Sequence, residues 1–232
     1  YKATRVKAPQ ELYDQIPRIK DLVKAFEIPI FEMEGFEADD ILGTLAKQAD
    51  RQNLLTYIVT GDLDTLQLVS EKTKIMTLAI KFSEPVIYDT AKVLGRYGLS
   101  PSQITDMKGL QGDNSDNIKG VSGIGPKTTK ILLQKYGNIE NIYQHLDEIE
   151  GTVHDKLRQD RESAFLSKRL ATIVTDMPIS LDLSVCKTHE YNEEKLRGIF
   201  QTLEFKSLLK RLDDFHKNSL EKRNNEKQAS LF

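Results

Sequence analysis

Residues 110–137, LQGDNSDNIKGVSGIGPKTTKILLQKYG, combine acids, glycines and lysines in an order that decides the fold of this part of the chain. Two aspartates three positions apart, Asp113 and Asp116, come first, and no other acid follows within the stretch. Glycines permit a tight turn, and Pro126 directly after Gly125 is typical of the first residue of a helix. The pattern therefore predicts two helices joined by a glycine turn.

The turn and the lysines around it predict a surface for phosphate groups. Backbone N–H groups at a helix N-terminus bind phosphate without reading sequence, and lysines on the first turns add positive charge. Ile124 can fill the space between the two helices. The alternative is an ordinary helical hairpin with a solvated basic face. The residues that we expect to face phosphate are Lys119, Gly120, Gly123, Gly125, Lys127, Thr128 and Lys130.

Upstream of this stretch, helical and strand patterns alternate, which favours an α/β sheet. Apolar residues recur at helical spacing over 8–26 and 37–52, and residues 28–33 form a short strand pattern. Residues 54–60, LLTYIVT, are a nearly continuous apolar run, which is typical of a buried parallel strand. A hairpin or two adjacent strands are predicted at 74–80 and 85–89.

After about residue 90 the sequence becomes almost entirely helical, and this change divides the chain. We expect an α/β core over 1–95, a helical region over 96–216 with the hairpin at about 101–137, and a flexible tail or linker over 217–232. Further helices are predicted at 139–147, 153–172 and 193–216.

Seven carboxylates form three acidic groups, and the first two groups flank the predicted strand 54–60. Because ligands bind at the carboxyl edge of open α/β sheets, these groups can meet there. Each group alone has a simpler interpretation, as a helix cap, a Gly-Asp turn or an Asx turn. Together the acids would repel one another unless cations neutralised them. The seven are Glu37, Asp39, Asp40, Asp62, Asp64, Asp113 and Asp116.

Oxygen ligands without histidine or cysteine suit Mg²⁺ or Mn²⁺, and a pair of such ions is a common device for phosphodiester hydrolysis. The acids thus predict a two-metal hydrolase, and the neighbouring lysines favour nucleic acid over a small phosphate ester as substrate. Two alternatives stay open: a non-catalytic module that binds duplex DNA, and a metal hydrolase acting on small phosphates.

The composition excludes several other classes. No apolar run approaches the roughly 18 residues of a membrane helix. The single cysteine, Cys186, excludes an internal disulfide and fits a reducing compartment. The net charge of −2 argues against a protein coated in positive charge, although local patches decide phosphate affinity. We expect a cytoplasmic monomer without a membrane partner.

Four motifs occur in an order and at spacings that resemble the 5′-nuclease (flap endonuclease) domain family of bacterial DNA polymerase I, over roughly residues 1–215. They are YKATR, EADDILGTLA, VTGDLDTLQLV and GLQGDNSDNIKGVSGIGPKTTKILL. The resemblance implies a PIN/resolvase-like, mainly parallel sheet followed by a helical region with the family's helix–three-turn–helix element. It implies a structure-specific, metal-dependent 5′-3′ exonuclease and flap endonuclease with a role in replication and repair.

Carried over to this sequence, the resemblance assigns roles to the motif residues. Glu37, Asp39 and Asp40 would serve the first Mg²⁺ or Mn²⁺, and Asp62, Asp64, Asp113 and Asp116 the second. Lys2 and Arg5 would contact the scissile phosphate, and Tyr1 would stack on a base. Backbone carbonyls of the glycine turn would hold a K⁺ ion. The implied partners are 5′-flap, nicked or gapped duplex DNA and RNA primer–DNA, in the bacterial nucleoid.

The sequence departs from the family pattern in three places. Lys119 stands where the family usually has proline, and Leu63 where a basic residue is common. The family's N-terminal strands, with further metal-binding aspartates, precede YKATR and are absent. We therefore expect a sheet that is incomplete on its N-terminal side, in an N-terminally truncated chain whose own activity is open.

The last five residues, QASLF, resemble the peptide by which bacterial proteins bind the sliding clamp. In that peptide a glutamine and a terminal Leu-Phe pair fill pockets of the clamp, which here would be Gln228, Leu231 and Phe232. The alternative is a linker whose apolar residues pack locally.

Overall fold

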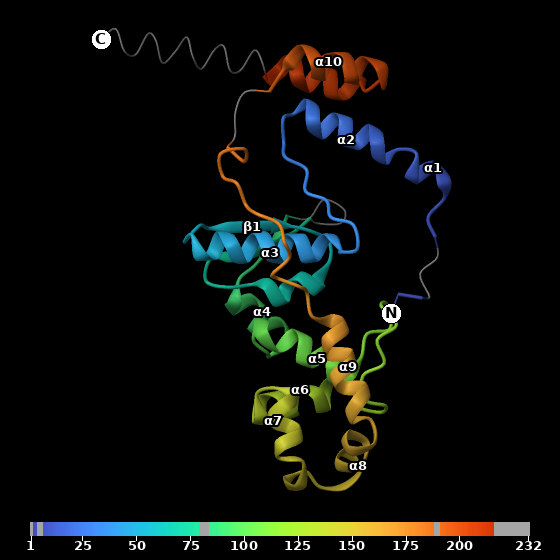
Figure 1. Cartoon of the computed structure of the whole chain (residues 1–232), viewed down its shortest axis with the longest axis vertical. Coiled ribbons are helices and arrows are strands. Elements are labelled where there is room, and N and C mark those ends of the chain that lie inside the picture. The colour runs from blue at the N-terminus through green and yellow to red at the C-terminus, as the bar shows by residue number, and fades with distance from the viewer. Residues whose placement is uncertain (1, 4–6, 79–83, 188–190, 216–232) are drawn as a thin grey trace, which may run out of the picture. The chain divides into compact units, whose positions relative to one another are not determined.

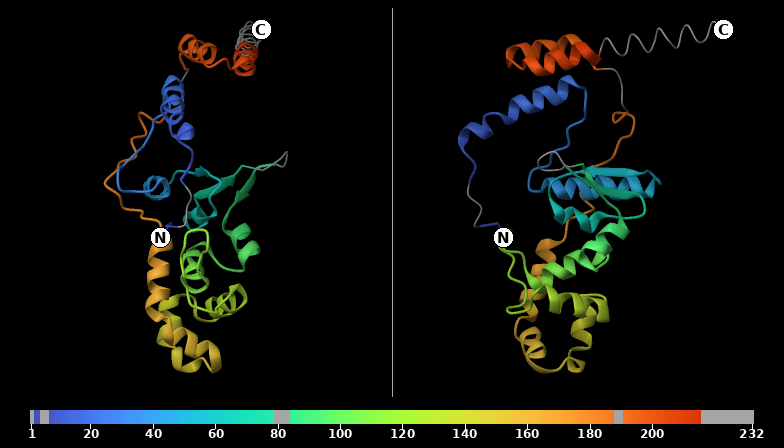
Figure 2. Two further views of the ribbon diagram at one scale, coloured as in Figure 1. Left: turned by 90° about the vertical axis from the view of Figure 1, so that its right-hand side faces the viewer. Right: turned by 180° about the vertical axis from the view of Figure 1, so that it is seen from behind.

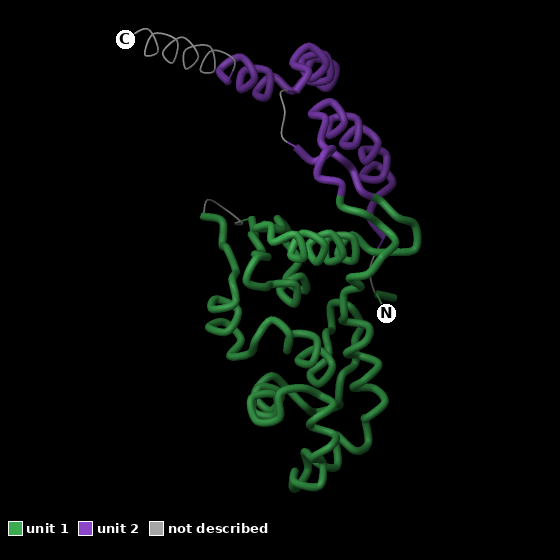
Figure 3. Tube along the Cα trace, turned by 60° about the vertical axis from the view of Figure 1, so that its left-hand side comes forward, with its two compact units in different colours: residues 1–6, 32–181 green, residues 7–31, 182–232 purple. Residues whose placement is uncertain are grey.

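The computed structural model describes residues 2–3, 7–78, 84–187 and 191–215. The chain folds into two compact units, shown in Figure 3. The large unit comprises residues 1–6 and 32–181, and the small unit comprises residues 7–31 and 182–232. The domain limits expected from the sequence, at 95/96 and 216/217, stay predictions.

A three-stranded mixed sheet forms the centre of the upper part of the large unit (Figure 1). Strand β1 (Thr56–Val59) runs parallel to β2 (Thr73–Thr77), and β2 pairs antiparallel with β3 (Val86–Tyr88). Helix α3 (Ala38–Arg51) precedes β1, and a 3₁₀ helix, η1 (Leu63–Leu68), follows it. The parallel pair and the two adjacent strands predicted from the sequence are confirmed.

Two strand predictions were wrong in part or in full. Residues 28–33 form no strand, because none of the three described strands pairs with them. The chain passes from one unit to the other within this segment. Strand β1 is not buried on both faces: Ile58 is 4% exposed, but Tyr57 and Val59 are 44% and 54% exposed. Among the described residues, β1 has a neighbouring strand on one side only.

Below the sheet, the large unit is helical. Its helices are α4 (Thr90–Tyr97), α5 (Ile104–Gln111), α6 (Pro126–Tyr136), α7 (Ile139–Gln144), α8 (Gly151–Gln159) and α9 (Arg161–Ala171). Figure 2 shows α9 running beside α5, against which it mainly packs. Leu110, Ile124, Leu133 and Leu157 lie in their common core.

The helix predicted over 153–172 is two helices, because the backbone of Asp160 leaves the helical region between α8 and α9. The prediction over 139–147 was too long, since α7 ends at Gln144 and a short 3₁₀ helix, Leu146–Glu148, follows. A polar residue such as Asp160 is useful at the break between α8 and α9, because its side chain can bind backbone groups outside its own helix.

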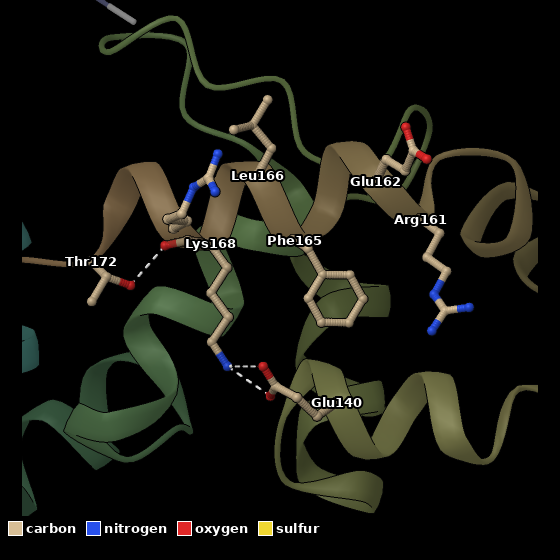
Figure 4. Close-up of a pocket in the computed structure, with 8 residues that line it drawn as sticks. Glu140, Arg161, Glu162, Phe165, Leu166, Lys168 and Thr172 are labelled. Carbon is tan, nitrogen blue, oxygen red and sulfur yellow. Dashed lines mark hydrogen bonds and ion pairs between the residues drawn. The ribbon is translucent and has the colours of Figure 1, made fainter.

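An ion-pair network braces α9 against its neighbours, as Figure 4 shows for part of it. The Lys168 ammonium donates to both carboxylate oxygens of Glu140, at 2.9 and 2.8 Å, and lies 2.6 Å from Oδ1 of Asp106. Burial raises the pKa of Asp106 despite the pull of Lys168. Asp106 Oδ1 also accepts a hydrogen bond from the Ile139 N–H, at 3.0 Å, so that one lysine ties α5, α7 and α9 together.

The small unit joins segments from both ends of the chain. It contains α1 (Gln10–Tyr13), α2 (Ile16–Ala25), α10 (Glu193–Thr202) and a helical stretch over residues 206–215. Its core holds Ala25, Leu196, Phe200 and Leu212. The helices predicted over 8–26 and 193–216 are therefore each interrupted once. None of the helices described is long and apolar enough to cross a membrane.

Candidate metal centre and phosphate-binding turn

Six of the seven predicted carboxylates line one cavity of about 150 Å³ in the large unit. Residues 170–174 and Lys2 also line it. A larger cavity of about 780 Å³ lies along α9, but Lys168 and Glu140 in its wall are paired with each other. The smaller cavity is therefore the candidate site. Its carboxylates are Glu37, Asp39, Asp40, Asp62, Asp64 and Asp116.

Local structure explains why the first two acidic groups gather here. Glu37 is the N-cap residue of α3, and Asp39 and Asp40 lie in its first turn, where the helix dipole favours negative charge. Asp62 caps η1, and its carboxylate accepts a hydrogen bond from the Asp64 N–H, at 3.0 Å. The helix-cap interpretation thus holds for Glu37, and Asp62 also caps a helix, yet both residues line the same cavity.

The electrostatics of Asp39 show how crowded the carboxylates are. Burial raises the pKa of Asp39 to about 6, and repulsion from Asp62, Asp64 and Glu37 adds to this effect. The Lys2 ammonium opposes the shift. A carboxylate with this raised pKa gains most from a cation bound beside it.

A second cluster joins acids from two distant parts of the sequence. Asp64, Asp113 and Asp116 each offer a carboxylate oxygen within 4.8 Å of the others. Asp116 is 5% exposed, and the other two are half-buried. Three carboxylate oxygens gathered in this way suit a divalent metal ion. The cluster thus places Asp113, which does not line the cavity, close to Asp64 and Asp116, which do.

Lys108, which was not predicted from the sequence, places its ammonium between two of these acids. The residue is 7% exposed, and its Nζ pairs with Asp64 and, at 2.7 Å, with Asp113. Burial opposes ionisation of Asp113, but Lys108 and Ser115 outweigh it and lower the pKa of Asp113 to about 2. A signal was present, because Lys108 follows Ile104 by four residues and so falls on the buried face of α5.

Asp64 responds differently to the same lysine. Its pKa is raised, because burial and repulsion by Asp62 and Asp113 outweigh the Lys108 contact. Asp113 has an additional donor, since the Ser115 N–H donates to it at 2.9 Å. We therefore interpret Asp113 as the primary ion-pair partner of Lys108 and Asp64 as the less satisfied acid.

Of the three N-terminal residues with predicted roles, one is described. Lys2 lines the acidic cavity and pairs with Glu37, and its backbone N–H donates to the Asp116 carbonyl, at 2.9 Å. Tyr1 and Arg5 lie outside the described residues, as do Gln228, Leu231 and Phe232 of the tail. The roles of all five stay predictions.

The glycine turn connects α5 and α6 as predicted. Gly112, Gly120 and Gly123 have φ angles of +75°, +65° and +73°, which disfavour any residue with a side chain. Gly125 is the N-cap of α6, which begins at Pro126. The prediction that Ile124 fills the space between the helices is confirmed, since it is 4% exposed and belongs to the helical core.

Side chains of α8 and α9 form hydrogen bonds with the backbone of this turn, and these contacts could not be predicted from the sequence. Gly120 donates its N–H to Ser167 Oγ, at 3.0 Å, and its carbonyl accepts from Ser163 Oγ, at 2.6 Å. The Gly123 carbonyl accepts from Lys156 Nζ, at 3.0 Å. Because these two carbonyls already accept hydrogen bonds, a K⁺ ion at the turn would need other carbonyls, or would share these two with their donors.

The side of the turn expected to meet phosphate carries several exposed groups. Lys119, Lys127 and Lys130 are exposed, and Thr128 is half-buried in the first turn of α6. Gly123 and Gly125 are exposed as well, whereas Gly120 is buried. The burial of Gly120 indicates a structural role within the turn, whereas the three exposed lysines add positive charge beside the turn.

Two family models together match residues 1–194. The first, the 5′-3′ exonuclease N-terminal resolvase-like domain, matches residues 1–98, and the second, the 5′-3′ exonuclease C-terminal SAM fold, matches residues 99–194. The chain belongs to the 5′-3′ exonuclease family. Both halves of the fold expected from the sequence, resolvase-like and then helical, are thereby confirmed.

Within this family, its relatives include bacterial DNA polymerases. The chain is 45% identical over 214 residues to DNA polymerase I of Caldicellulosiruptor bescii, covering 91% of this chain and 25% of that protein. It is 41% identical over 215 residues to DNA polymerase I of Bacillus subtilis, covering 92% and 24%. The chain thus spans about a quarter of the length of these curated relatives.

Solved structures with a similar fold include two nucleases. The T5 D15 protein co-crystallized with metal ions superposes with a TM-score of 0.60 at 23% identity, covering 75% of this chain and 68% of that one. The catalytic core of Rad2 in complex with a DNA substrate gives 0.54 at 20% identity, covering 85% and 66%. At these identities the likeness shows the fold.

Proposed function

We propose that the protein is a metal-dependent 5′-3′ exonuclease and flap endonuclease that hydrolyses phosphodiester bonds of DNA. Its substrates would be 5′ flaps, nicked or gapped duplexes and RNA primers on DNA, in the bacterial cytoplasm. The observation that carries the proposal is the convergence of Asp64, Asp113 and Asp116 within 4.8 Å, beside a cavity lined by the remaining acids. Membership of the 5′-3′ exonuclease family supports it.

The acids divide into two groups that fit two Mg²⁺ or Mn²⁺ ions. Glu37, Asp39 and Asp40 line the cavity together with Asp62, and Asp64, Asp113 and Asp116 form the second group. Bound ions would activate water and stabilise charge on the scissile phosphate. The Lys108 ammonium holds two of the carboxylates in place and would share them with an ion. Lys2 would meet the phosphate at the rim of the cavity.

The glycine turn would grip the duplex backbone away from the cut. Exposed Lys119, Lys127 and Lys130 would contact phosphates, together with the N-terminus of α6 at Thr128. The turn would also hold K⁺ through its carbonyls. We include base stacking by Tyr1, a phosphate contact by Arg5, and clamp binding by Gln228, Leu231 and Phe232 in the proposal on the motif resemblance alone.

One observation favours a second candidate, a duplex-binding protein without chemistry. Lys108 already compensates Asp64 and Asp113, so part of the acidic cluster is neutralised without a metal. The two candidates differ in a simple way: only the nuclease requires a divalent ion for its effect on DNA.

The test is cleavage of a labelled 5′-flap duplex by this chain and by the full-length gene product, with Mg²⁺ or with EDTA. We expect Mg²⁺-dependent cleavage and a loss of at least about 100-fold on Asp113→Asn. Cleavage by neither protein, or cleavage that survives Asp113→Asn, would contradict the proposal. Metal-independent DNA binding without cleavage would support the second candidate.

A paired measurement separates grip from cut. The double variant Lys127→Gln/Lys130→Gln should weaken duplex binding and lower the slope of log Kd against log salt by about 2, since each phosphate contact contributes about 1. Its cleavage rate at saturating DNA should stay unchanged. Lys92→Gln, which removes an exposed lysine of α4, is the matched control and should alter neither quantity.

A further inference from the structure

One face of α3 carries polar side chains at intervals of four residues, and all of them bind the same distant segment. We call Asp40, Thr44 and Gln48 the polar ladder, and residues 173–181 the strap. The strap belongs to no strand. Because residues four apart lie on one side of a helix, the ladder can follow an extended chain laid along α3.

The contacts are regular. Asp40 Oδ1 accepts from the Val174 N–H, at 2.8 Å. Thr44 Oγ1 accepts from the Met177 N–H, at 3.3 Å, and donates to the Val174 carbonyl, at 3.4 Å. Gln48 donates to the Ile179 carbonyl, at 2.7 Å, and accepts from the Leu181 N–H, at 2.8 Å. The ladder thus satisfies backbone groups that a neighbouring strand would otherwise satisfy.

The surface of α3 is shaped for this close approach. A Cβ at Gly43 would lie 2.8 Å from Ile173 Cγ2 and 3.2 Å from Thr175 Cγ2, so a side chain there would push the strap away. Gln67 of η1 holds the start of the strap, accepting from the Ile173 N–H at 2.9 Å. The strap is therefore fixed at its start by η1 and along its length by α3.

The first rung of the ladder lies at the acidic cavity. The cavity wall includes Ile173 and Val174, which are the first two residues of the strap. Both carboxylate oxygens of Asp40 are engaged by backbone N–H groups: Oδ1 by Val174, and Oδ2 by Glu37, at 3.0 Å. Asp39, one residue earlier, lines the cavity among Glu37 and Asp62.

We propose that Asp40 is a positioning residue and not a metal ligand, which fastens the strap to the N-terminus of α3 and thereby sets the wall of the acidic cavity. The inference rests on the proposed metal-dependent function and refines it, because it removes one carboxylate from the ligand set. It also gives Thr44 and Gln48, which lie farther along α3, a part in shaping the same wall.

The test compares Asp40→Asn with Asp39→Asn in two measurements on this chain: Mn²⁺ binding by calorimetry, and hydrogen–deuterium exchange at Val174 and Leu181. A side-chain amide in place of the Asp40 carboxylate can accept from one backbone N–H but cannot accept two through both atoms. Asp40→Asn should speed exchange at Val174 by about tenfold, as expected for one lost hydrogen bond, and change the Mn²⁺ Kd by less than about threefold. Asp39→Asn should do the reverse, weakening Mn²⁺ binding at least about tenfold with exchange unchanged.

Thr44→Val supplies a second variant should Asp40→Asn fold poorly. It removes the next rung without altering any carboxylate, and it should speed strap exchange while leaving the Mn²⁺ Kd unchanged. Loss of Mn²⁺ binding in Asp40→Asn equal to that in Asp39→Asn overturns the inference. So does unchanged strap exchange in both ladder variants. If the wild-type chain binds no Mn²⁺, the proposed metal site fails, whereas strap exchange still decides the positioning role.

Discussion

The acidic cavity and the glycine turn are linked in the sequence by Asp116, four residues before Gly120, but their groups meet opposite physical conditions. In the cavity, carboxylates crowd one another, and the pKa of Asp39 rises to about 6. In the turn, the backbone groups of Gly120 are both hydrogen-bonded to serines of α9. The cavity is thus poised to gain from a cation, whereas the turn is already satisfied and offers a fixed shape. The two regions should therefore respond in different ways to substitution and to added ions.

The largest effect is expected from Gly120→Ala, which disrupts the glycine turn, where the backbone groups of this residue are already hydrogen-bonded. Its φ of +65° disfavours a Cβ, and that Cβ would lie 2.3 Å from the Gly112 nitrogen and 2.7 Å from the Leu110 carbonyl oxygen. We expect a loss of about 3–5 kcal/mol in the free energy of unfolding, from the backbone penalty and the overpacking together. Urea denaturation followed by circular dichroism measures it.

Gly125→Ala is the control for this substitution. Gly125 has a φ of −102°, and no atom lies within 4 Å of a Cβ built there. A change of about 1 kcal/mol or less is expected, from the poorer N-cap that alanine makes. Equal losses from the two variants would show that the turn is not held in the way the contacts of Gly120 indicate.

A somewhat smaller effect is expected from Lys108→Met, which sharpens the comparison because it leaves more uncompensated negative charge at the acidic residues. The side chain is 8% exposed and compensates Asp64 and Asp113, so its removal leaves two half-buried acids without their cation. We expect a loss of about 2–3 kcal/mol without divalent ions. Mg²⁺ should restore more stability to this variant than to the wild type, because the ion no longer competes with an ammonium.

Thermal unfolding with EDTA and with Mg²⁺ measures both the loss of stability in Lys108→Met and its recovery when the ion is added. Lys92→Met, at an exposed position on α4, serves as the control and should change stability by less than about 0.5 kcal/mol. A Mg²⁺ response in Lys108→Met no greater than that of the wild type would argue that the acids around Lys108 do not bind the ion.

Local patterns in the sequence were sufficient for much of this architecture. The spacing of Gly120, Gly123 and Gly125 before Pro126 predicted the turn and the start of α6, because positive φ angles and helix starts depend on a few adjacent residues. The meeting of the first two acidic groups followed from where strand β1 ends and α3 begins.

What the sequence could not supply were contacts between distant side chains and backbone. Ser163 and Ser167 hold Gly120 from more than 40 positions away, and Asp40 holds Val174 from 134. A serine on a helix carries no local sign of its partner. The strand predicted at residues 28–33 failed for a related reason, since a strand needs a neighbour and its own apolar pattern does not provide one.

The sign of the pH effect at Asp39 follows from its raised pKa. The folded chain keeps the Asp39 proton up to about pH 6, whereas the unfolded chain loses it near 3.8. Between these values the folded state binds more protons, so the contribution of Asp39 to stability is greatest below pH 4 and is lost as the pH rises through about 6. At neutral pH the ionised carboxylate therefore destabilises the metal-free fold.

The smallest effect is thus a gain: Asp39→Asn should stabilise the metal-free chain at pH 7 by about 1 kcal/mol, a value reduced for solvent screening of a half-buried group. The gain should vanish at pH 4, where the wild-type carboxyl is largely protonated. Mg²⁺ should reverse the order, because the ion stabilises the wild type through the carboxylate that the variant lacks. Chemical denaturation at pH 4 and 7, with EDTA and with Mg²⁺, gives all four values. A variant less stable than the wild type at pH 7 in EDTA would mean that Asp39 is satisfied by its neighbours, and the contrast between a crowded cavity and a satisfied turn would then not hold at this residue.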